Sequence, residues 1–161
     1  MRKLLTVMTA LLMSLLNLPG LCGSRALAVE TETIWVVCQP DSSVNIRSKA
    51  SGRSEQVGYA LPGDDFQTDG EKKNGFLHIF APIEAMEGWI SLGYVVWEEP
   101  EKVYEVREIE ASGRVAARRT IDGKRRRWLK PGDTVTVYYI AEWCVTSAGF
   151  VRWEYLGGVI E

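Results

Sequence analysis

The sequence is poor in the residues on which metal centres and nucleophilic sites depend. It has one histidine and three cysteines in 161 residues, and one of these, Cys22, lies in the apolar N-terminal segment. The others, Cys38, Cys144 and His78, show no metal-ligand spacing and no recognisable nucleophile motif. No glycine-rich phosphate loop is present either. We therefore expect no catalytic residue, no metal and no cofactor, and a small cysteine hydrolase pairing His78 with Cys144 or Cys38 is the least favoured alternative.

Long apolar runs are absent after the N-terminus. Residues 4–16 are mostly apolar, follow two basic residues and precede a Pro-Gly pair, and residues 26–28 (Ala-Leu-Ala) resemble a cleavage site. We interpret residues 1–28 as a secretory signal peptide, which is too short for a comfortable membrane span. Acylation of Cys22 is less favoured, because a leucine precedes it. The sequence thus predicts a secreted or cell-wall-associated protein with no stable membrane span after cleavage.

Charge of one sign is not spread evenly along the chain. Residues 29–100 hold 5 basic and 12 acidic side chains, a net of −7, whereas residues 101–161 hold 11 basic and 9 acidic ones, a net of +2. Halves of opposite sign suggest two modules with different surfaces. Because the exported chain is acidic as a whole, we expect no nucleic-acid partner.

The two halves also match each other in sequence. At an offset of 69, Ile46 falls on Val115, and the Pro-Gly-Asp of residues 62–64 falls on that of residues 131–133. The offset then drops to 61, where the Gly-Trp-Ile of residues 88–90 meets a Gly-Phe-Val, so the second copy lacks eight residues. Two constant offsets with a single deletion predict a duplicated module of about 60 residues, a size able to fold alone.

Strand signals recur at short intervals through both copies, and no long segment has a helical period. Turn-forming pairs separate the strands, among them Asn74-Gly75 and Asp122-Gly123. This pattern predicts an all-β fold of two small β-barrels in tandem. The first module is expected in residues 29–97 and the second in residues 103–161, joined by a charged, proline-containing linker at residues 98–102.

Two cysteines remain in the predicted modules. Cys38 and Cys144 form an even pair, and in an exported protein such a pair permits one disulfide. The rival interpretation is two small buried hydrophobic residues, one in each module. Both interpretations stay open at the level of sequence.

Three motifs stand out in the first module. They are Val44-Asn45-Ile46-Arg47-Ser48, Leu61-Pro62-Gly63-Asp64, and Gly88-Trp89-Ile90 with Tyr94-Val95. These motifs resemble those of the bacterial SH3-like (SH3b) domain family. The second module matches the second and third motifs but has, at an offset of 69, Val115-Ala116-Ala117 where Arg-Ser is expected, so we interpret it as a diverged copy. The resemblance implies two SH3-like barrels in tandem, export, and binding to cell-wall peptidoglycan peptides or, in some members, to other proteins.

Most aromatic residues of the first module are expected to pack in its core or rim. Tyr59 and Tyr94 are our candidates for a groove wall, because a phenol offers an apolar face and a polar tip. An extended peptide docks readily in such a groove. Phe76 and Asp64 complete the predicted ligand-binding set, with Asp64 facing a ligand ammonium, although the matching Asp133 favours a structural role at the turn.

Basic side chains gather in the second module, and strand alternation would place some of them on one face. They form either a solvated hairpin or a face for an anionic partner, such as teichoic acid or an acidic protein surface. The predicted face comprises Lys124, Arg125, Arg126 and Arg127, with Arg114, Arg118, Arg119 and Lys130 nearby.

Taken together, the sequence favours an exported, non-catalytic binding protein for cell-wall peptidoglycan peptides, with the second module adding affinity through tethering. The alternative is an extracellular protein–protein interaction adaptor, whose acidic and basic modules meet different partners.

Overall fold

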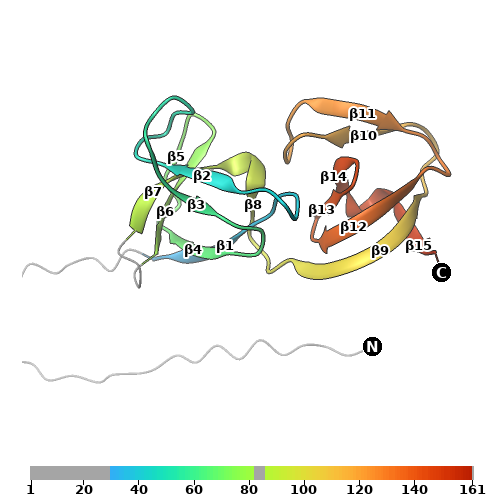
Figure 1. Cartoon of the computed structure of the whole chain (residues 1–161), viewed down its shortest axis with the longest axis horizontal. Coiled ribbons are helices and arrows are strands. Elements are labelled where there is room, and N and C mark those ends of the chain that lie inside the picture. The colour runs from blue at the N-terminus through green and yellow to red at the C-terminus, as the bar shows by residue number, and fades with distance from the viewer. Residues whose placement is uncertain (1–29, 82–85, 161) are drawn as a thin grey trace, which may run out of the picture.

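The computed structural model describes residues 30–81 and 86–160 (Figure 1). The predicted signal peptide, residues 1–28, therefore lies outside the described residues. Strands make up nearly all of the regular structure, with two single-turn 3-10 helices, so the predicted all-β class is confirmed. No helix in the described ranges is long and apolar enough to traverse a bilayer.

The first sheet, called module one below, is antiparallel and has the strand order β3-β2-β7-β6-β4-β1-β8, with β5 paired to β6. Its terminal strands, β3 and β8, are not hydrogen-bonded to each other along this path. Its elements are β1 (Glu32–Val36), β2 (Val44–Arg47), β3 (Gln56–Ala60), β4 (Asp65–Thr68), β5 (Lys72–Lys73), β6 (Phe76–Ala81), β7 (Met86–Ser91), η1 (Leu92–Tyr94) and β8 (Val95–Val96).

The second sheet, module two, has the order β11-β10-β14-β13-β12-β9-β15, which repeats that of module one when strands are matched along the chain. Only β5 lacks a counterpart, and it lies in the stretch where the second copy is eight residues shorter. The elements are β9 (Glu101–Ile109), β10 (Val115–Arg118), β11 (Arg125–Leu129), β12 (Thr134–Ile140), β13 (Trp143–Thr146), β14 (Gly149–Arg152), η2 (Trp153–Tyr155) and β15 (Leu156–Val159).

Each module has a core of its own, built by strand alternation. In β2, for example, Val44 and Ile46 are buried while Asn45 between them is exposed. The core of module one includes Ile34, Ile46, Leu77, Ile79 and Ile90. That of module two includes Ile109, Leu129, Val135, Val137 and Val151.

The sheet registers correct the alignment of the two copies. Arg47 pairs with Trp89 and Arg118 pairs with Phe150, and each arginine follows a register shift in its hairpin. Arg118 is thus the counterpart of Arg47, where the gapless offset had placed Ala116. The prediction that module two lacks this arginine was wrong. The loop after β10 is two residues shorter than the loop after β2, so a gapless alignment through both loops shifts β10 by two residues.

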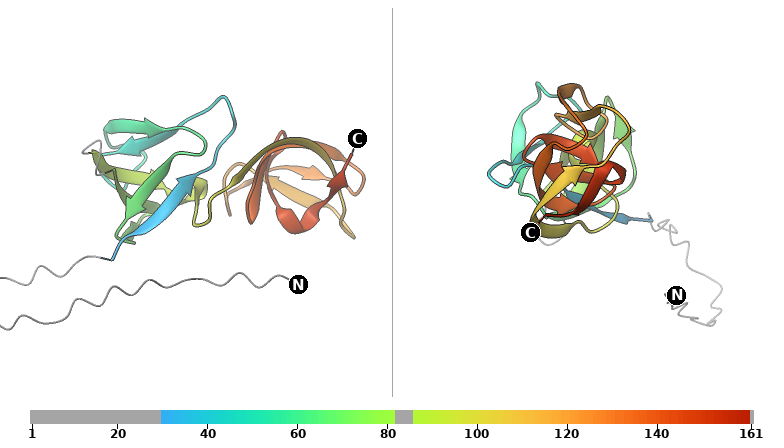
Figure 2. Two further views of the ribbon diagram at one scale, coloured as in Figure 1. Left: turned by 90° about the horizontal axis from the view of Figure 1, so that it is seen from below. Right: turned by 90° about the vertical axis from the view of Figure 1, so that its right-hand side faces the viewer.

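A third hydrophobic cluster lies between the modules, which stand next to each other in the ribbon view of Figure 2. Val37 and Val96 of module one pack with residues of module two, and the Tyr94 and Phe150 rings meet edge to face at 6.0 Å between centroids. Two hydrogen bonds cross the same boundary, from the Ile121 amide to the Gly93 carbonyl at 2.8 Å and from the Gln39 side chain to the Thr146 carbonyl at 3.0 Å. The module-two residues of this cluster are Tyr139, Trp143, Val145 and Phe150.

The two cysteines are buried, free thiols in different cores. Cys38 belongs to the core of module one and Cys144 to that of module two, and each sulfur donates a hydrogen bond to a nearby carbonyl, of Ser42 and Ala141 respectively. The disulfide that the sequence permitted is therefore not formed in this structure. The burial matches the rival interpretation, in which each cysteine is a small core residue.

Candidate functional site

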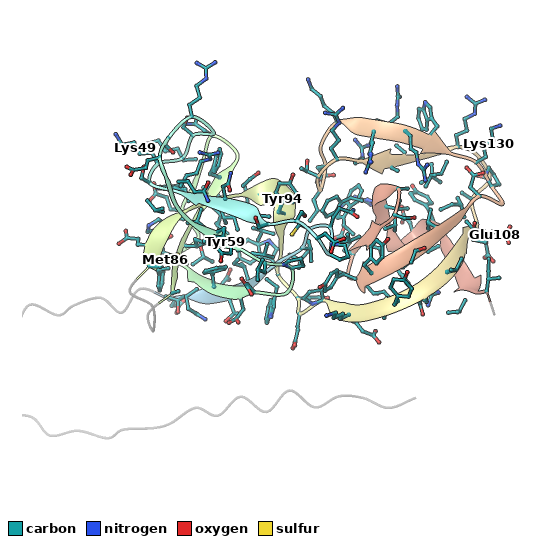
Figure 3. The ribbon with its side chains drawn as sticks, in the orientation of Figure 1. Lys49, Tyr59, Met86, Tyr94, Glu108 and Lys130 are labelled. Carbon is teal, nitrogen blue, oxygen red and sulfur yellow. The ribbon has the colours of Figure 1, made fainter. Side chains whose placement is uncertain are left out.

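The structure places the predicted groove residues of module one on three different elements. Tyr59 is 61 % exposed and lies on the terminal strand β3, opposite Asn45. Tyr94 lies in η1 on the side that faces module two, where it packs against Phe150 (Figure 3). Burial raises the pKa of its phenol. Phe76 is half-buried at the start of β6. Tyr94 thus belongs to the boundary between the modules.

Asp64 has a role within its turn. One oxygen of its carboxylate accepts a hydrogen bond from the Leu61 amide at 2.7 Å, and Asp133 accepts one from the Lys130 amide at 2.8 Å. In both turns the glycine before the aspartate has positive φ, 94° at Gly63 and 85° in module two, a conformation that glycine adopts at little cost. The repeated geometry fits the structural role that the matching aspartate had favoured.

A hollow of about 560 Å³ lies between the modules and is lined by aromatic side chains. We call it the tyrosine crevice. The β1–β2 loop contributes Pro40, Asp41 and Ser42, β9 contributes Lys102, Val103 and Tyr104, and β12 contributes Tyr138 and Tyr139. Ligand sites favour such concave positions between domains, with apolar walls and a few polar groups. This is the best candidate site in the described part of the chain.

An irregularity in strand pairing brings the two outer rings of the crevice together. Lys102 pairs with Tyr139 and Glu105 with Val137, so two residues of β9 oppose the single Tyr138 of β12. Such a bulge twists the strand and re-aims side chains. The rings of Tyr104 and Tyr138 consequently lie 5.9 Å apart, tilted by 46°, and Tyr104 is 82 % exposed.

The opposite wall of the crevice is held by local hydrogen bonds. The Ser42 amide and hydroxyl both donate to the Gln39 carbonyl, at 3.0 and 2.9 Å. The Gln39 side chain is itself tied to module two through the Thr146 carbonyl. The loop that carries Asp41 is therefore fixed relative to the tyrosines before a ligand arrives, which reduces the ordering cost of binding.

The crevice can hold an amphipathic ligand with charges at its ends. Phenol rings provide apolar faces with hydroxyl tips, and the carboxylate of Asp41 and the ammonium of Lys102 offer one charge of each sign. Sequence reasoning missed this site. The available signal was an aromatic residue at an exposed, alternating position of a charged strand, at Tyr104, together with the turn-forming Pro40-Asp41.

The predicted basic residues are exposed in β11 and at the residue before it, and their local contacts differ. The Arg125 guanidinium lies over the Trp128 ring, 4.5 Å from its centroid. Arg127 pairs with Ala117 in the hairpin, and the carbonyl of Lys124 accepts a hydrogen bond from the Arg119 amide. Arg126 lines a small hollow at the edge of module two.

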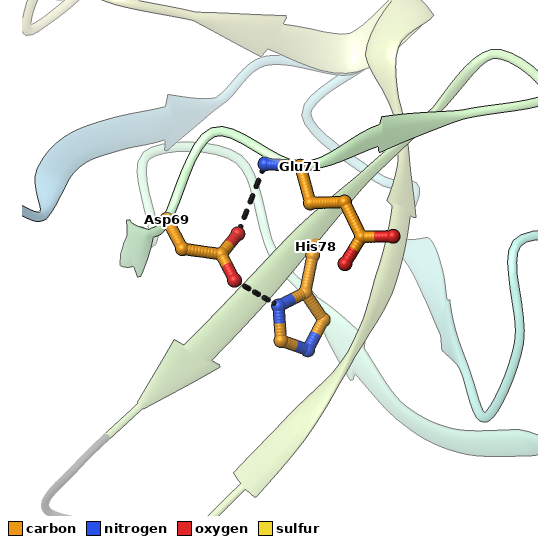
Figure 4. Close-up of side chains that lie close together, drawn as sticks. All are labelled: Asp69, Glu71 and His78. Carbon is orange, nitrogen blue, oxygen red and sulfur yellow. Dashed lines mark hydrogen bonds and ion pairs between the residues drawn. The ribbon is translucent and has the colours of Figure 1, made fainter. Parts of the chain in front are cut away.

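The single histidine lies in a cluster of carboxylates (Figure 4). Its Nδ1 is 2.9 Å from Asp69, and the Glu71 amide donates to the other oxygen of Asp69 at 3.0 Å. Its Nε2 is 3.0 Å from Glu87. Ligand atoms of Asp69, Glu71 and His78 lie within 4.8 Å of one another, close enough to share a cation. Both imidazole nitrogens already contact carboxylates, so we interpret the cluster as an ion-pair network.

The two thiols are poorly suited to nucleophilic chemistry. Burial raises the pKa of Cys38, and it raises the pKa of Cys144 to about 11. A thiol attacks as its thiolate and needs access to substrate. Cys144 is fully buried, and the hydrogen-bond partner of each sulfur in the described structure is a backbone carbonyl.

Comparisons with known proteins give little further guidance. Neither a family model nor a curated protein matches the sequence. Two solved structures from Trichomonas vaginalis are similar: NlpC1, at 12% identity and a TM-score of 0.35, with 80% of this chain and 46% of that chain covered, and NlpC2, at 11% identity and a TM-score of 0.35, with 81% and 49% covered. The chain therefore spans about half the length of either protein, and likeness at this level carries no argument about function.

Proposed function

We propose that the protein is an exported, non-catalytic binding protein, built from two SH3b-like modules, that takes peptides of the cell wall in the tyrosine crevice. The observation that carries this proposal is the crevice itself, about 560 Å³ in volume and lined by Tyr104 and Tyr138 with Asp41 and Lys102 at its polar positions. Its volume is in the range of small-ligand sites.

The chemistry of wall peptides fits the crevice. These peptides are short and carry ammonium and carboxylate groups beside small apolar side chains. Asp41 matches the ammonium, Lys102 matches a carboxylate, and the tyrosine rings cover the apolar portion. The resemblance of the Val44–Ser48 and Gly88–Ile90 motifs to SH3b domains supports the same ligand class.

The state of the thiols supports the non-catalytic part of the proposal. Cys144 has a pKa of about 11 and is fully buried, so very little thiolate is present near neutral pH. His78 has both nitrogens against carboxylates and is hydrogen-bonded to neither cysteine in the described structure. A Cys–His hydrolase would need these groups in contact.

The direct test is sedimentation of residues 29–161 with insoluble peptidoglycan stripped of phosphate-bearing polymers, at low and high salt. We expect binding that survives high salt and falls at least about tenfold in Tyr104→Ala/Tyr138→Ala, since buried aromatic anchors carry much of a binding energy. Tyr59→Ala is the matched control, because Tyr59 is exposed but does not line the crevice. Failure of the wild type to sediment, or an equal loss in the control, would refute the proposal.

A second candidate function is an extracellular adaptor that binds another protein. The observation that favours it is Trp128, 48 % exposed beneath the Arg125 guanidinium, because tryptophan and arginine are enriched at protein–protein hot spots. A photoreactive residue at position 128 should then crosslink one defined partner in living cells. The same crosslink should weaken in Arg125→Gln and persist in Arg53→Gln.

A further inference from the structure

Module two has a second hollow, of about 280 Å³, that differs in chemistry from the tyrosine crevice. We call it the arginine hollow. It is lined by Arg118, Arg119, Arg126 and Gly149 of module two and by Gln39 of module one. Three arginines and one glutamine thus line a small space that has no acidic lining residue.

The three arginines have no ionic partner within the described structure. The ion pairs formed there by arginine side chains belong to Arg107 and Arg152. Asp122 lies near Arg118 in an adjoining hollow but forms no ion pair with it. Three neighbouring arginines without an ion-pair partner raise the local positive potential, and an anion bound there would lower it.

The floor of the arginine hollow is rigid. The Arg118 side chain is held by a 2.8 Å hydrogen bond to the Gly123 carbonyl. Gly149 has φ of +127°, and a Cβ there would lie 2.3 Å from the Arg118 carbonyl oxygen, so the two backbones are packed as closely as glycine permits. Gln39 is fixed by its bond to Thr146. The exposed Arg119 and Arg126 can then close on a ligand from the rim.

We propose that the arginine hollow binds a phosphate group of a phosphodiester or phosphoanhydride polymer. Guanidinium forks bind phosphate oxygens in a bidentate manner, and several arginines together favour phosphate over a single carboxylate. A polymer is favoured over a free ion because the basic run from Lys124 to Arg127 continues from the hollow along β11.

The lining argues against a nucleic acid as this polymer. Proteins that hold single strands combine basic grooves with aromatic rings on which bases stack. The arginine hollow contains no aromatic side chain, and the nearest exposed ring on the same strand, Trp128, is already covered by Arg125. Gln39 lines both hollows, but the arginines of this inference do not line the tyrosine crevice, so it can fail independently of the proposed function.

The test is calorimetric titration of residues 29–161 with a short linear polyphosphate at fixed salt. We expect Arg119→Gln/Arg126→Gln to weaken binding at least about tenfold, since two charge-assisted contacts are lost. The matched control is Arg114→Gln/Lys130→Gln, which removes the same charge from exposed positions outside the hollow and should change affinity less than about threefold. All four side chains are exposed, and thermal unfolding verifies that each variant folds.

Each alternative outcome overturns a defined part of the inference. Equal losses in both double variants would mean attraction by net charge, without a site. No loss in either would exclude the arginine hollow. If inorganic phosphate bound as tightly as the polymer, the preference for a polymer would be refuted. If poly-glutamate of equal charge bound as tightly, the recognition of phosphate would be refuted. Preference for an oligothymidine would replace the proposed partner by a nucleic acid.

Discussion

At the scale of single residues, His78 shows how neighbours decide a charge state. Partial burial alone would lower the pKa of His78, but the hydrogen bonds and charges of Asp69 and then Glu87 outweigh it, so the pKa is raised. The pKa of Asp69 is lowered, first by the Glu71 amide and then by His78. An imidazole between two carboxylates, at 2.9 and 3.0 Å, is most stable when both nitrogens carry protons.

This network predicts a pH-dependent contribution to stability. Because the folded pKa of His78 lies above its unfolded value of about 6.5, its contribution is complete below that pH and disappears as the pH rises through the folded pKa. His78→Gln should therefore be less stable than wild type at pH 6, by about 1 kcal/mol or less for so exposed a network, and the difference should shrink by pH 8 to 9. Urea unfolding of both proteins across this range measures it.

The single histidine makes that comparison clean, because no other imidazole titrates in the chain. Asp69 has the opposite pH dependence. Its folded pKa is lowered, so its contribution to stability is present above its unfolded pKa and is lost as the pH falls through the folded pKa. Parallel stability curves for wild type and His78→Gln between pH 6 and 9 would contradict the assigned network.

At the scale of elements, the two β-hairpins β2–β3 and β10–β11 share one device for closing their loops. The Arg47 guanidinium donates to the Ser54 carbonyl at 2.7 Å, and the Arg118 guanidinium donates to the Gly123 carbonyl at 2.8 Å. Both arginines follow the bulge of their hairpin. This arginine-to-carbonyl hydrogen bond is present in both hairpins although their loops differ in length, so it is a feature of the module's fold.

Removal of the arginine should loosen the loop of module one. Arg47→Ala takes away the donor to the half-buried Ser54, which should cost about 1 to 2 kcal/mol in the free energy of unfolding. Arg53→Ala on the same loop is the control, and because this position is exposed, the variant should stay within about 0.5 kcal/mol of wild type. Hydrogen exchange of the Ser48 amide, which bonds to the Glu55 carbonyl, reports on the loop directly. Equal exchange rates in both variants would exclude this role.

The sequence predicted the positions of strands and turns better than it predicted which residues of the two modules are equivalent. Turn chemistry was readable, and Asn74 and Asp122 do adopt positive φ, each 52°, at the predicted turns. The alignment of the two copies failed where their loops differ in length. The amides of Val36 and Ile109 donate to the carbonyls of Asp64 and Asp133 respectively, so the two residues are equivalent, yet they are 73 positions apart. A gapless offset of 69 cannot show this.

The candidate site was beyond the sequence for a related reason. Asp41, Tyr104 and Tyr138 come from three distant segments, and they meet because the modules pack together and because one strand bulges. Neither event has a local sequence signal. Tyr94 was singled out for its chemistry, but the packing of module two places it in the boundary between the modules.

At the scale of the whole molecule, the two modules differ at the position through which module one packs against module two. The amide of Val37 bonds to the Tyr94 carbonyl, and that of Glu110 bonds to the Tyr155 carbonyl, so Val37 and Glu110 occupy equivalent places. Val37 is fully buried in the cluster between the modules, whereas Glu110 is exposed. Module two thus carries a polar residue where module one offers an apolar one, and its equivalent face is not suited to packing a further module in the same way.

This asymmetry predicts the result of exchanging the two residues. Val37→Glu buries a carboxylate without a partner in the cluster of Trp143 and Phe150, which should cost about 3 kcal/mol or more and separate the modules. One cooperative unfolding transition should become two, and the radius of gyration in X-ray scattering should rise. Glu110→Val is the mirror control and should remain within about 0.5 kcal/mol of wild type, because that side chain is exposed. If Val37→Glu kept a single transition at wild-type stability, the boundary cluster would not be what holds the modules together.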